Sequence, residues 1–238
     1  MKRIAHVFGR ERVLLPVVHP VTRDRAFTAV DVAVAAGADG VFLIDQGLNE
    51  REVVALIGEV YRRHPALWVG VNLLSRTPAD ALAFVLEANG RIDGIWTDNA
   101  GIDERSTDQV RAKQFVDARQ RLGWKGLYFG GVAFKYQREV PRADLGRASA
   151  LAADYMDVIC TSGVGTGHAA DPAKPRAMRE GARDTALALA SGVTTDNVSE
   201  YLPHVDAYLV GTGIERELGV LDHDATKRLA TTIHAFIA

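Results

Sequence analysis

The stretch Gly37-Ala38-Asp39-Gly40-Val41 places an aspartate directly before a short apolar run. Three later stretches repeat this arrangement, each about two strand–helix units further along: Arg91-Ile92-Asp93-Gly94-Ile95, Tyr155-Met156-Asp157-Val158-Ile159 and His204-Val205-Asp206-Ala207-Tyr208. A module that recurs four times at near-constant spacing indicates a repeat architecture, and four copies of a (β/α)2 module suit a closed ring. We expect the four aspartates to be structural and to cap one end of that ring.

Short apolar runs recur along the whole chain, and they are apolar on both faces, as parallel strands buried under helices are. They are Val13–Val18, Gly40–Ile44, Leu67–Val71, Gly94–Thr97, Gly126–Phe129, Asp157–Thr161, Thr185–Ala190 and Ala207–Val210. Their carboxyl ends fall about 20 to 32 residues apart, the length of one strand, one helix and two loops. Eight such units predict a (β/α)8 barrel, and no linker interrupts them, so we expect one domain over residues 1–238.

Helix-like stretches fill the intervals between the runs. They are Asp24–Ala36, Asn49–Arg63, Pro78–Asn89, Ser106–Leu122, Asp144–Asp154, Thr194–Leu202 and Asp224–Ile237. Several carry boundary signals, such as Thr77-Pro78 at a helix start and Gly90 and Gly123 near helix ends.

Composition bounds the classes of function. Of 238 residues, 47% are hydrophobic and 24% charged, and the formal net charge is -2. No global basic field marks a nucleic-acid or membrane surface, so neither partner is expected. The single cysteine, Cys160, allows no internal disulfide, and the amino-terminal residues lack the apolar stretch of a signal peptide. We expect a cytoplasmic protein, and the sequence leaves homo-oligomer formation open.

Ligands of such barrels bind at the carboxyl ends of the strands, where the loops after strands seven and eight usually hold phosphate. Three glycine-rich loops follow the last three runs, and glycines let successive backbone N–H groups approach an anion. The sequence therefore predicts a phosphate site there, with a short helix after strand eight aimed at it. The expected ligand-binding residues are Ser162, Gly163, Gly165, Ser191, Gly192, Gly211 and Thr212, together with Asn72 after strand three.

The other half of the mouth should carry the chemistry. Asp45 and Asp98 are candidate acid–base groups, because two carboxylates near one cavity tend to have separated pKa values; the alternative for each is loop capping. Lys135 could neutralise a substrate anion, form an imine or stabilise an enolate, or could simply be solvated. His19 is an acid–base or ligand-contact candidate, with a packed, hydrogen-bonded histidine as the alternative.

No cofactor is predicted. His19, Asp45 and Asp98 together could hold a divalent cation, although no HxH or HExxH spacing supports that. Cys160 ends strand six and is expected to be buried packing rather than a nucleophile.

The chain resembles the BtpA family of (β/α)8 barrels, which is related in architecture to the phosphate-binding barrels of tryptophan and thiamine biosynthesis. Matching segments include Pro16-Val17-Val18-His19, Gly70-Val71-Asn72-Leu73-Leu74 and Phe134-Lys135, and the longest runs from Ser191 to Val198. The chain departs from the family pattern at Asp45-Gln46, which replaces Glu-Asn, and at the shortened loop after Asp98. The resemblance implies the barrel, the phosphate site and a lysine after strand five.

Two hypotheses of function follow. The first is an enzyme acting on a phosphorylated sugar, nucleotide or ribosyl compound by lyase, isomerase or hydrolase chemistry, with Asp45, Asp98 and Lys135 in the acid–base roles. The second is a non-catalytic phosphate-ligand sensor or assembly factor. Convergence of those three side chains on one cavity would favour the enzyme.

Overall fold

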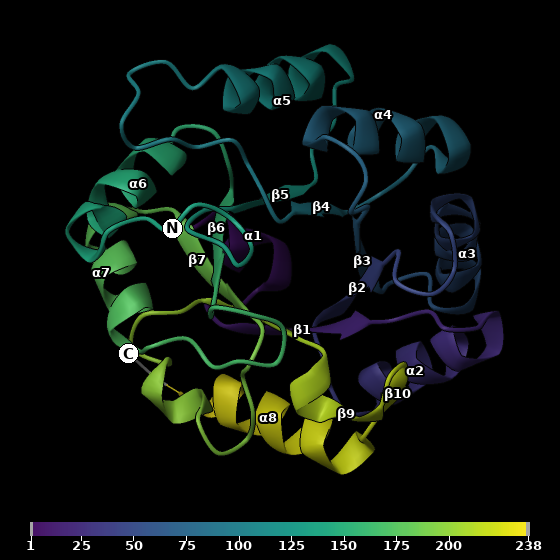
Figure 1. Cartoon of the computed structure of the whole chain (residues 1–238). Helices are drawn as coiled ribbons and strands as arrows, with labels where there is room; N and C mark the ends of the chain where they lie inside the picture. Colours follow the sequence, from purple (N-terminus) through teal and green to yellow (C-terminus); the bar gives the residue numbers. More distant parts are fainter. Residues whose placement is uncertain (1, 237–238) are drawn as a thin grey trace.

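The computed structural model describes residues 2–236, and its central element is a closed barrel of eight parallel strands in sequence order (Figure 1). The strands are β1 (Val13–Val18), β2 (Gly40–Ile44), β3 (Trp68–Asn72), β4 (Gly94–Thr97), β5 (Leu127–Gly131), β6 (Val158–Ser162), β7 (Ala186–Ala190) and β8 (Ala207–Val210). Strand β1 pairs with both β2 and β8, which closes the ring. The predicted (β/α)8 fold is therefore confirmed.

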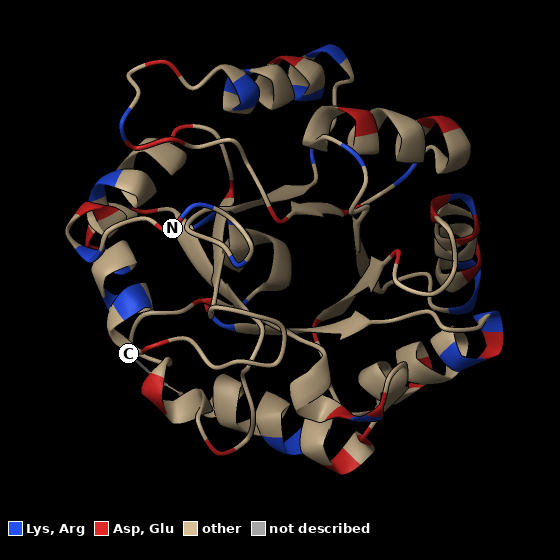
Figure 2. Ribbon diagram, in the orientation of Figure 1, with Lys and Arg blue, Asp and Glu red and all other residues tan. Residues whose placement is uncertain are grey.

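Helices surround the barrel as an outer ring (Figure 1). They are α2 (Arg23–Ala35), α3 (Glu50–Arg63), α4 (Pro78–Asn89), α5 (Val110–Arg121), α6 (Leu145–Ala152), α7 (Ala173–Gly181) and α8 (His223–Ala235). Both signs of charge are distributed around this ring (Figure 2). In the described part of the chain, no helix is both long and apolar enough to cross a membrane.

Two expectations about helices were wrong. Helix α7 was not predicted, because its sequence is polar and contains Pro175. The predicted helix Thr194–Leu202 is instead a run of turns around a short 3-10 helix, η2 (Val198–Glu200). The segment between β7 and β8 is short and contains Pro203, so its residues do not continue into a full α-helix.

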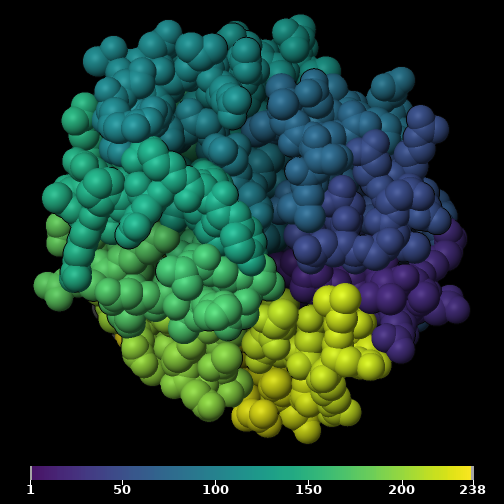
Figure 3. Space-filling model, viewed as in Figure 1, coloured from purple at the N-terminus to yellow at the C-terminus, as the bar shows by residue number. Residues whose placement is uncertain are grey.

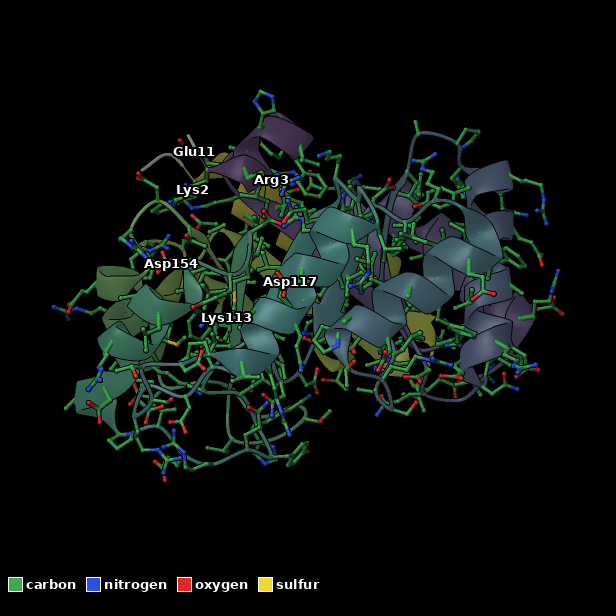
Figure 4. All side chains as sticks on the ribbon, turned by 90° about the horizontal axis from the view of Figure 1, so that it is seen from above. Lys2, Arg3, Glu11, Lys113, Asp117 and Asp154 are labelled. Carbon is green, nitrogen blue, oxygen red and sulfur yellow. The ribbon has the colours of Figure 1, made fainter. Side chains whose placement is uncertain are left out.

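A helix that the sequence did not suggest, α1 (Arg3–Phe8), covers the amino-terminal end of the barrel. Ile4 is fully buried, and the Phe8 ring lies 5.2 Å from that of Trp68 inside the barrel. Figure 4 shows the barrel from the side, with Lys2 and Arg3 at this end and α5 running along the wall. We call this amino-terminal end the base and the opposite end, where the strands finish, the mouth.

The four repeated aspartates make the same pair of hydrogen bonds at the base, as expected. Each accepts the backbone N–H of one residue in the preceding odd-numbered strand and donates its own N–H to that residue's carbonyl. The side-chain bonds join Asp39 to Leu14, Asp93 to Val69, Asp157 to Tyr128 and Asp206 to Leu187, at 2.8, 3.1, 2.8 and 2.8 Å. The matching backbone bonds are 2.8 to 3.1 Å long. The repeat in the sequence is thus a repeat in strand pairing.

These aspartates are also neutralised. Asp206, 4% exposed, pairs with Lys2 at 2.6 Å and Arg179 at 2.8 Å. Asp157 pairs with Arg3 and Arg119, and Asp39 contacts Arg10 and His234. Buried carboxylates require such partners, because an unpaired buried charge is costly.

The barrel interior is filled by aromatic rings rather than left open. Phe42 makes edge contacts with Trp68, Trp96 and Phe129 at centroid distances of 5.1 to 5.6 Å. Gly70 on β3 makes room for this layer, because a Cβ atom there would lie 2.2 Å from the Phe42 ring. A ligand would therefore bind at an end of the barrel and not inside it, and barrels of this kind bind ligands where the strands end.

After β8 the chain forms a short 3-10 helix, η3 (Thr212–Ile214), where a helix aimed at the phosphate site was expected. An antiparallel hairpin of β9 (Glu215–Glu217) and β10 (Val220–Leu221) then precedes α8. This hairpin lies at the mouth, beside the start of the loop after β1.

Candidate functional site

A cavity of about 260 Å³ opens at the centre of the mouth, and we call it the central cavity. Loops from distant parts of the sequence meet around it, as the converging colours in Figure 3 show. Six of the predicted site residues line it: His19, Asp98, Lys135, Ser191, Gly211 and Thr212. The Ser191-Gly192 and Gly211-Thr212 turns therefore lie on one rim, as closure of the barrel requires.

Asp98, at the end of β4, is fixed by its neighbours on three sides. Its Oδ1 accepts the Nδ2–H of Asn72 at 2.9 Å, so Asn72 acts on the cavity through Asp98. Its carbonyl accepts a hydrogen bond from Gln137. Gly131 lets β5 approach this backbone, because a Cβ atom there would lie 1.9 Å from the Asp98 carbonyl oxygen.

Burial raises the pKa of the Asp98 carboxyl, and this effect outweighs the opposing hydrogen bond from Asn72 and the positive charge of Lys135. A carboxyl group whose proton affinity is raised can both take up and release a proton nearer neutral pH, which acid–base catalysis requires.

Lys135 projects into the glycine-rich part of the rim. Its Nζ donates to Ser191 Oγ and to Thr166 Oγ1, each at 3.0 Å. Its backbone N–H donates to Ser162 Oγ at 2.8 Å, which fixes the lysine to the end of β6. Ser162 is therefore a support for Lys135 rather than a residue of the central cavity.

The backbone around these groups adopts uncommon conformations. Ala133, Tyr136 and Ser191 have φ of 49°, 60° and 77°, values rare for residues with a side chain. Such conformations cost free energy and are found mainly where function or packing requires them. Here they flank Lys135 and carry Ser191, the two groups that hydrogen-bond to each other.

Loops six, seven and eight interlock through glycines. A Cβ atom on Gly192, whose φ is 70°, would lie 2.2 Å from the His168 backbone, and one on Gly213 would lie 1.9 Å from the Val193 carbonyl oxygen. Gly192 therefore serves first to bring loop seven against loop six, whereas Gly211 and Thr212 face the cavity directly.

His19 makes a contact that the sequence did not reveal. Its Nδ1 lies 2.8 Å from Oε1 of Glu215 in β9, and both side chains are nearly inaccessible, at 8% and 4% exposed. The same Glu215 oxygen accepts the N–H of Gly219 at 3.0 Å, which fixes the carboxylate in the hairpin turn. Nδ1 carries the hydrogen in this arrangement, so Nε2 is left as the nitrogen available to other groups.

Asp45 does not line the central cavity. Its Oδ1 accepts the backbone N–H of Leu74 at 2.8 Å, so it ties the loop after β2 to the loop after β3. Burial raises its pKa. The loop-capping alternative describes this residue, and Asp98 stands without the second carboxylate that the sequence suggested.

Two more predicted residues lie beside the central cavity. Gly163 and Ser162 line a neighbouring cavity of about 430 Å³, together with Lys174 of α7. The Lys174 Nζ donates to the carbonyls of Ala133 and Ser162, and burial lowers its pKa to about 8. Gly165 lies in loop six, where an added Cβ atom would lie 3.2 Å from Nδ1 of His168.

Two further predictions concerned Cys160 and a metal site. Cys160 is fully buried, and burial raises the pKa of its thiol well above the usual range, as its predicted packing role requires. Within residues 2–236, no group of three or more His, Cys, Asp and Glu side chains is placed to hold a metal ion. His19 and Asp98 line the central cavity and Asp45 does not, so the three side chains named for a divalent cation do not share that cavity.

In comparison with solved structures, the chain is similar in fold to several barrel enzymes at low sequence identity. It is similar to (S)-3-O-geranylgeranylglyceryl phosphate synthase from Thermoplasma acidophilum in complex with sn-glycerol-1-phosphate, at a TM-score of 0.67 and 14% identity, covering 99% of this chain and 100% of that one. It is also similar to N-(5'-phosphoribosyl)anthranilate isomerase from Pyrococcus furiosus (TM-score 0.64, 13% identity, 92% and 97% covered). The phosphoribosyl anthranilate isomerase from Thermus thermophilus is similar as well, at a TM-score of 0.61 and 16% identity, covering 91% of this chain and 96% of that one.

Neither a family model nor a curated protein matches the chain. The similarities to solved structures establish the fold, and the resemblance to the BtpA family stays a prediction.

Proposed function

We propose that the protein is an enzyme that binds a phosphorylated sugar, nucleotide or ribosyl compound in the central cavity and transforms it by acid–base chemistry. The observation that carries this proposal is the meeting of three groups on one small cavity. They are the Lys135 ammonium with its two hydroxyl partners, the Asp98 carboxyl and the His19–Glu215 pair.

The phosphate end is assigned to the side of the cavity formed by loops five to eight. An ammonium, two hydroxyl groups and the Gly211-Thr212 turn supply a positive charge and several donors, the groups that bind phosphate. Ser162 fixes the backbone of Lys135, and Thr166 and Ser191 already hold its ammonium group, so little side-chain freedom is lost when an anion binds.

The reacting part of the substrate then faces Asp98 and His19. Asp98 exchanges a proton with the substrate, because its pKa is raised towards the range useful for a general acid or base. His19 Nε2 exchanges the second proton. Glu215 holds the ring in one tautomer by accepting from Nδ1 and would stabilise the imidazolium. Paired proton transfers of this kind suit isomerase, lyase or hydrolase chemistry.

The solved structures support the choice of substrate class. One of the similar enzymes binds sn-glycerol-1-phosphate and two act on a phosphoribosyl compound, all on this fold. Fold likeness raises the expectation of a phosphate ligand without selecting one.

The test is a thermal-shift screen of inorganic phosphate and phosphorylated metabolites, followed by turnover assays on the binders. A ligand at about 100 times its Kd should stabilise the fold by roughly 2.7 kcal/mol. Lys135→Met and Ser191→Ala should remove the shift. Gly192 is a poor choice here, since any side chain would displace His168. Arg121→Met, on the outer face of α5, is the control. Phosphate compounds that stabilise Lys135→Met as well as the native chain would refute the proposal.

The placement of Asp45 keeps the non-catalytic binder as a second candidate, since one of three expected acid–base groups lies outside the cavity. Tight phosphate binding without turnover of any bound compound would favour it.

A further inference from the structure

A second cavity adjoins the central one at the mouth, with a volume of about 380 Å³, and we call it the side cavity. It lies between the loop after β3 and the loop after β4, and Asp98 and Leu74 line both cavities. A ligand anchored beside Lys135 would have to extend past Asp98 to reach the side cavity.

Two arginines line the side cavity, and they differ in whether a carboxylate neutralises their charge. Arg76 forms a two-point ion pair with Glu50, with N···O distances of 2.6 and 2.7 Å, and its guanidinium stacks on Phe84. Arg111 has no carboxylate within 4.0 Å among residues 2–236, and its guanidinium makes no hydrogen bond to the described residues. Arg111 is thus the arginine of the side cavity without an ion-pair partner among the described residues, and the one carboxyl group that lines this cavity with the two arginines is that of Asp98.

The backbone holds Arg111 in place. It lies in the first turn of α5, which carries no acidic residue, so the amino-terminal end of the helix dipole adds to its positive potential. Gly101, with φ of 74°, gives its stem room, because a Cβ atom there would lie 2.4 Å from the Arg111 Cβ. The amides of Asn99 and Gln114 line the same cavity and can add hydrogen-bond donors.

We propose that the substrate carries a carboxylate at the end opposite its phosphate, and that Arg111 binds this carboxylate in the side cavity. A guanidinium binds either a carboxylate or a phosphate by two parallel hydrogen bonds. Because the phosphate is assigned to the rim beside Lys135, we assign a carboxylate to Arg111. This inference rests on the proposed function, since it places the phosphate beside Lys135. It adds that the two anionic ends place the reacting atoms beside Asp98, the residue that the two cavities share.

The cavity on the other side of Lys135 is a less suitable site for the carboxylate. Arg142 and Lys174 line it, but so do Glu139 and Asp171, which offset their charge. Its walls also do not include Asp98, so a substrate lying there would bypass the acid–base group.

The experiment compares two series of probes by calorimetry: alkylphosphonates and ω-phosphonoalkanoates of matched, increasing chain length. Each pair differs only in the terminal carboxylate. At the chain length that spans the two sites, the carboxylate should tighten binding about tenfold, equivalent to ~1.4 kcal/mol. Arg111→Gln should abolish this gain while its Kd for inorganic phosphate stays that of the native chain, which shows that the variant is folded. Arg142→Gln, in the other cavity, is the matched control and should keep the gain.

The outcomes separate the two proposals. If alkylphosphonates bind but no chain length gains from the carboxylate, or if Arg111→Gln keeps the gain, the carboxylate site is overturned and the phosphate site stands. Loss of the gain in Arg142→Gln alone would move the carboxylate to the other cavity and overturn the assignment. If inorganic phosphate and every phosphonate fail to bind, the proposed function itself falls.

Discussion

The two ends of the barrel differ in how their polar and charged groups are arranged. At the base, Asp39, Asp93, Asp157 and Asp206 repeat one hydrogen-bond pattern four times, and cations neutralise them. At the mouth, each loop differs from the next, and three non-glycine residues have positive φ.

The difference shows where stability and function are separated in this fold. Charges at the base are satisfied within the protein, so they contribute to stability and have little left to offer a ligand. The mouth holds groups whose charge is only partly met: a carboxyl with a raised pKa, a lysine bonded to two neutral hydroxyls, and an unpaired Arg111. Such separation is expected of barrels whose loops at one end carry the chemistry.

The largest effect is expected from Asp98→Asn at the mouth. The amide keeps the shape and the contact with Asn72 but cannot exchange a proton, so turnover should fall about 10²- to 10⁴-fold. The free energy of unfolding should not fall, because an ionised group is removed from a site that burial makes unfavourable for charge. Turnover rates and urea titrations of the two proteins measure both quantities. If Asp98→Asn kept its turnover but lost stability, Asp98 would have a structural role, contrary to this comparison of the two ends.

Asp206→Ala at the base should give the opposite result. It removes a carboxylate that accepts the Leu187 N–H and leaves Arg179 and Lys2 unpaired, at a cost of about 3–4 kcal/mol in the free energy of unfolding. Below the unfolding transition, phosphate binding should be unchanged. Asp154→Ala is the control, since the exposed Asp154–Arg183 pair should contribute little. Weakened phosphate binding with native stability would contradict the comparison.

Glu215→Gln tests a single contact within the mouth. The amide is a weaker acceptor for the His19 N–H, and loss of a charged hydrogen bond is worth about 1.5–3 kcal/mol, so kcat should fall roughly 10- to 150-fold. The Kd for inorganic phosphate should not change, because the phosphate lies beside Lys135. Equal losses of phosphate affinity and kcat would show that Glu215 supports the whole rim instead of His19.

The smallest effect concerns pH. Burial raises the folded-state pKa of Asp98 above its unfolded value, so its contribution to stability is fully present below the unfolded pKa, near 4. That contribution is lost as pH rises through the raised folded pKa. The native chain should therefore lose stability relative to Asp98→Asn as pH rises from about 4 towards neutrality. If the two proteins differ in free energy of unfolding by the same amount at every pH, the raised pKa of Asp98 is contradicted.

The fold could be predicted from the sequence because strand and helix units leave local patterns. Apolar runs located all eight strands, and the limits of β1, β2, β4 and β8 are those predicted. Strands β3 and β6 each begin and end one residue later than predicted, so they finish at Asn72 and Ser162. There a polar residue continues the ladder at the mouth, where the apolar pattern has already ended.

The candidate site was predicted less completely, because it depends on contacts between distant segments. The rule that ligands bind where strands end found Asp98 and Lys135, but it also selected Asp45, whose side chain instead bonds to Leu74. Glu215 lies in a hairpin that resembles any polar turn, and its partner His19 is separated from it by almost the whole barrel sequence. Arg111 is one of many helix arginines until its lack of a carboxylate partner is seen.

The aspartate pairs at the base also mark four segments of the chain in which two successive strands are paired locally. Each pair lies within one segment, such as Leu14 to Asp39, so the stagger of its two strands is fixed locally. A circular permutation that opens the chain at residues 64–67, between two such segments, would leave all four pairs intact. New termini at residues 36–39 would instead convert the contact between Leu14 and Asp39 from a local one into one between chain ends, and should slow folding.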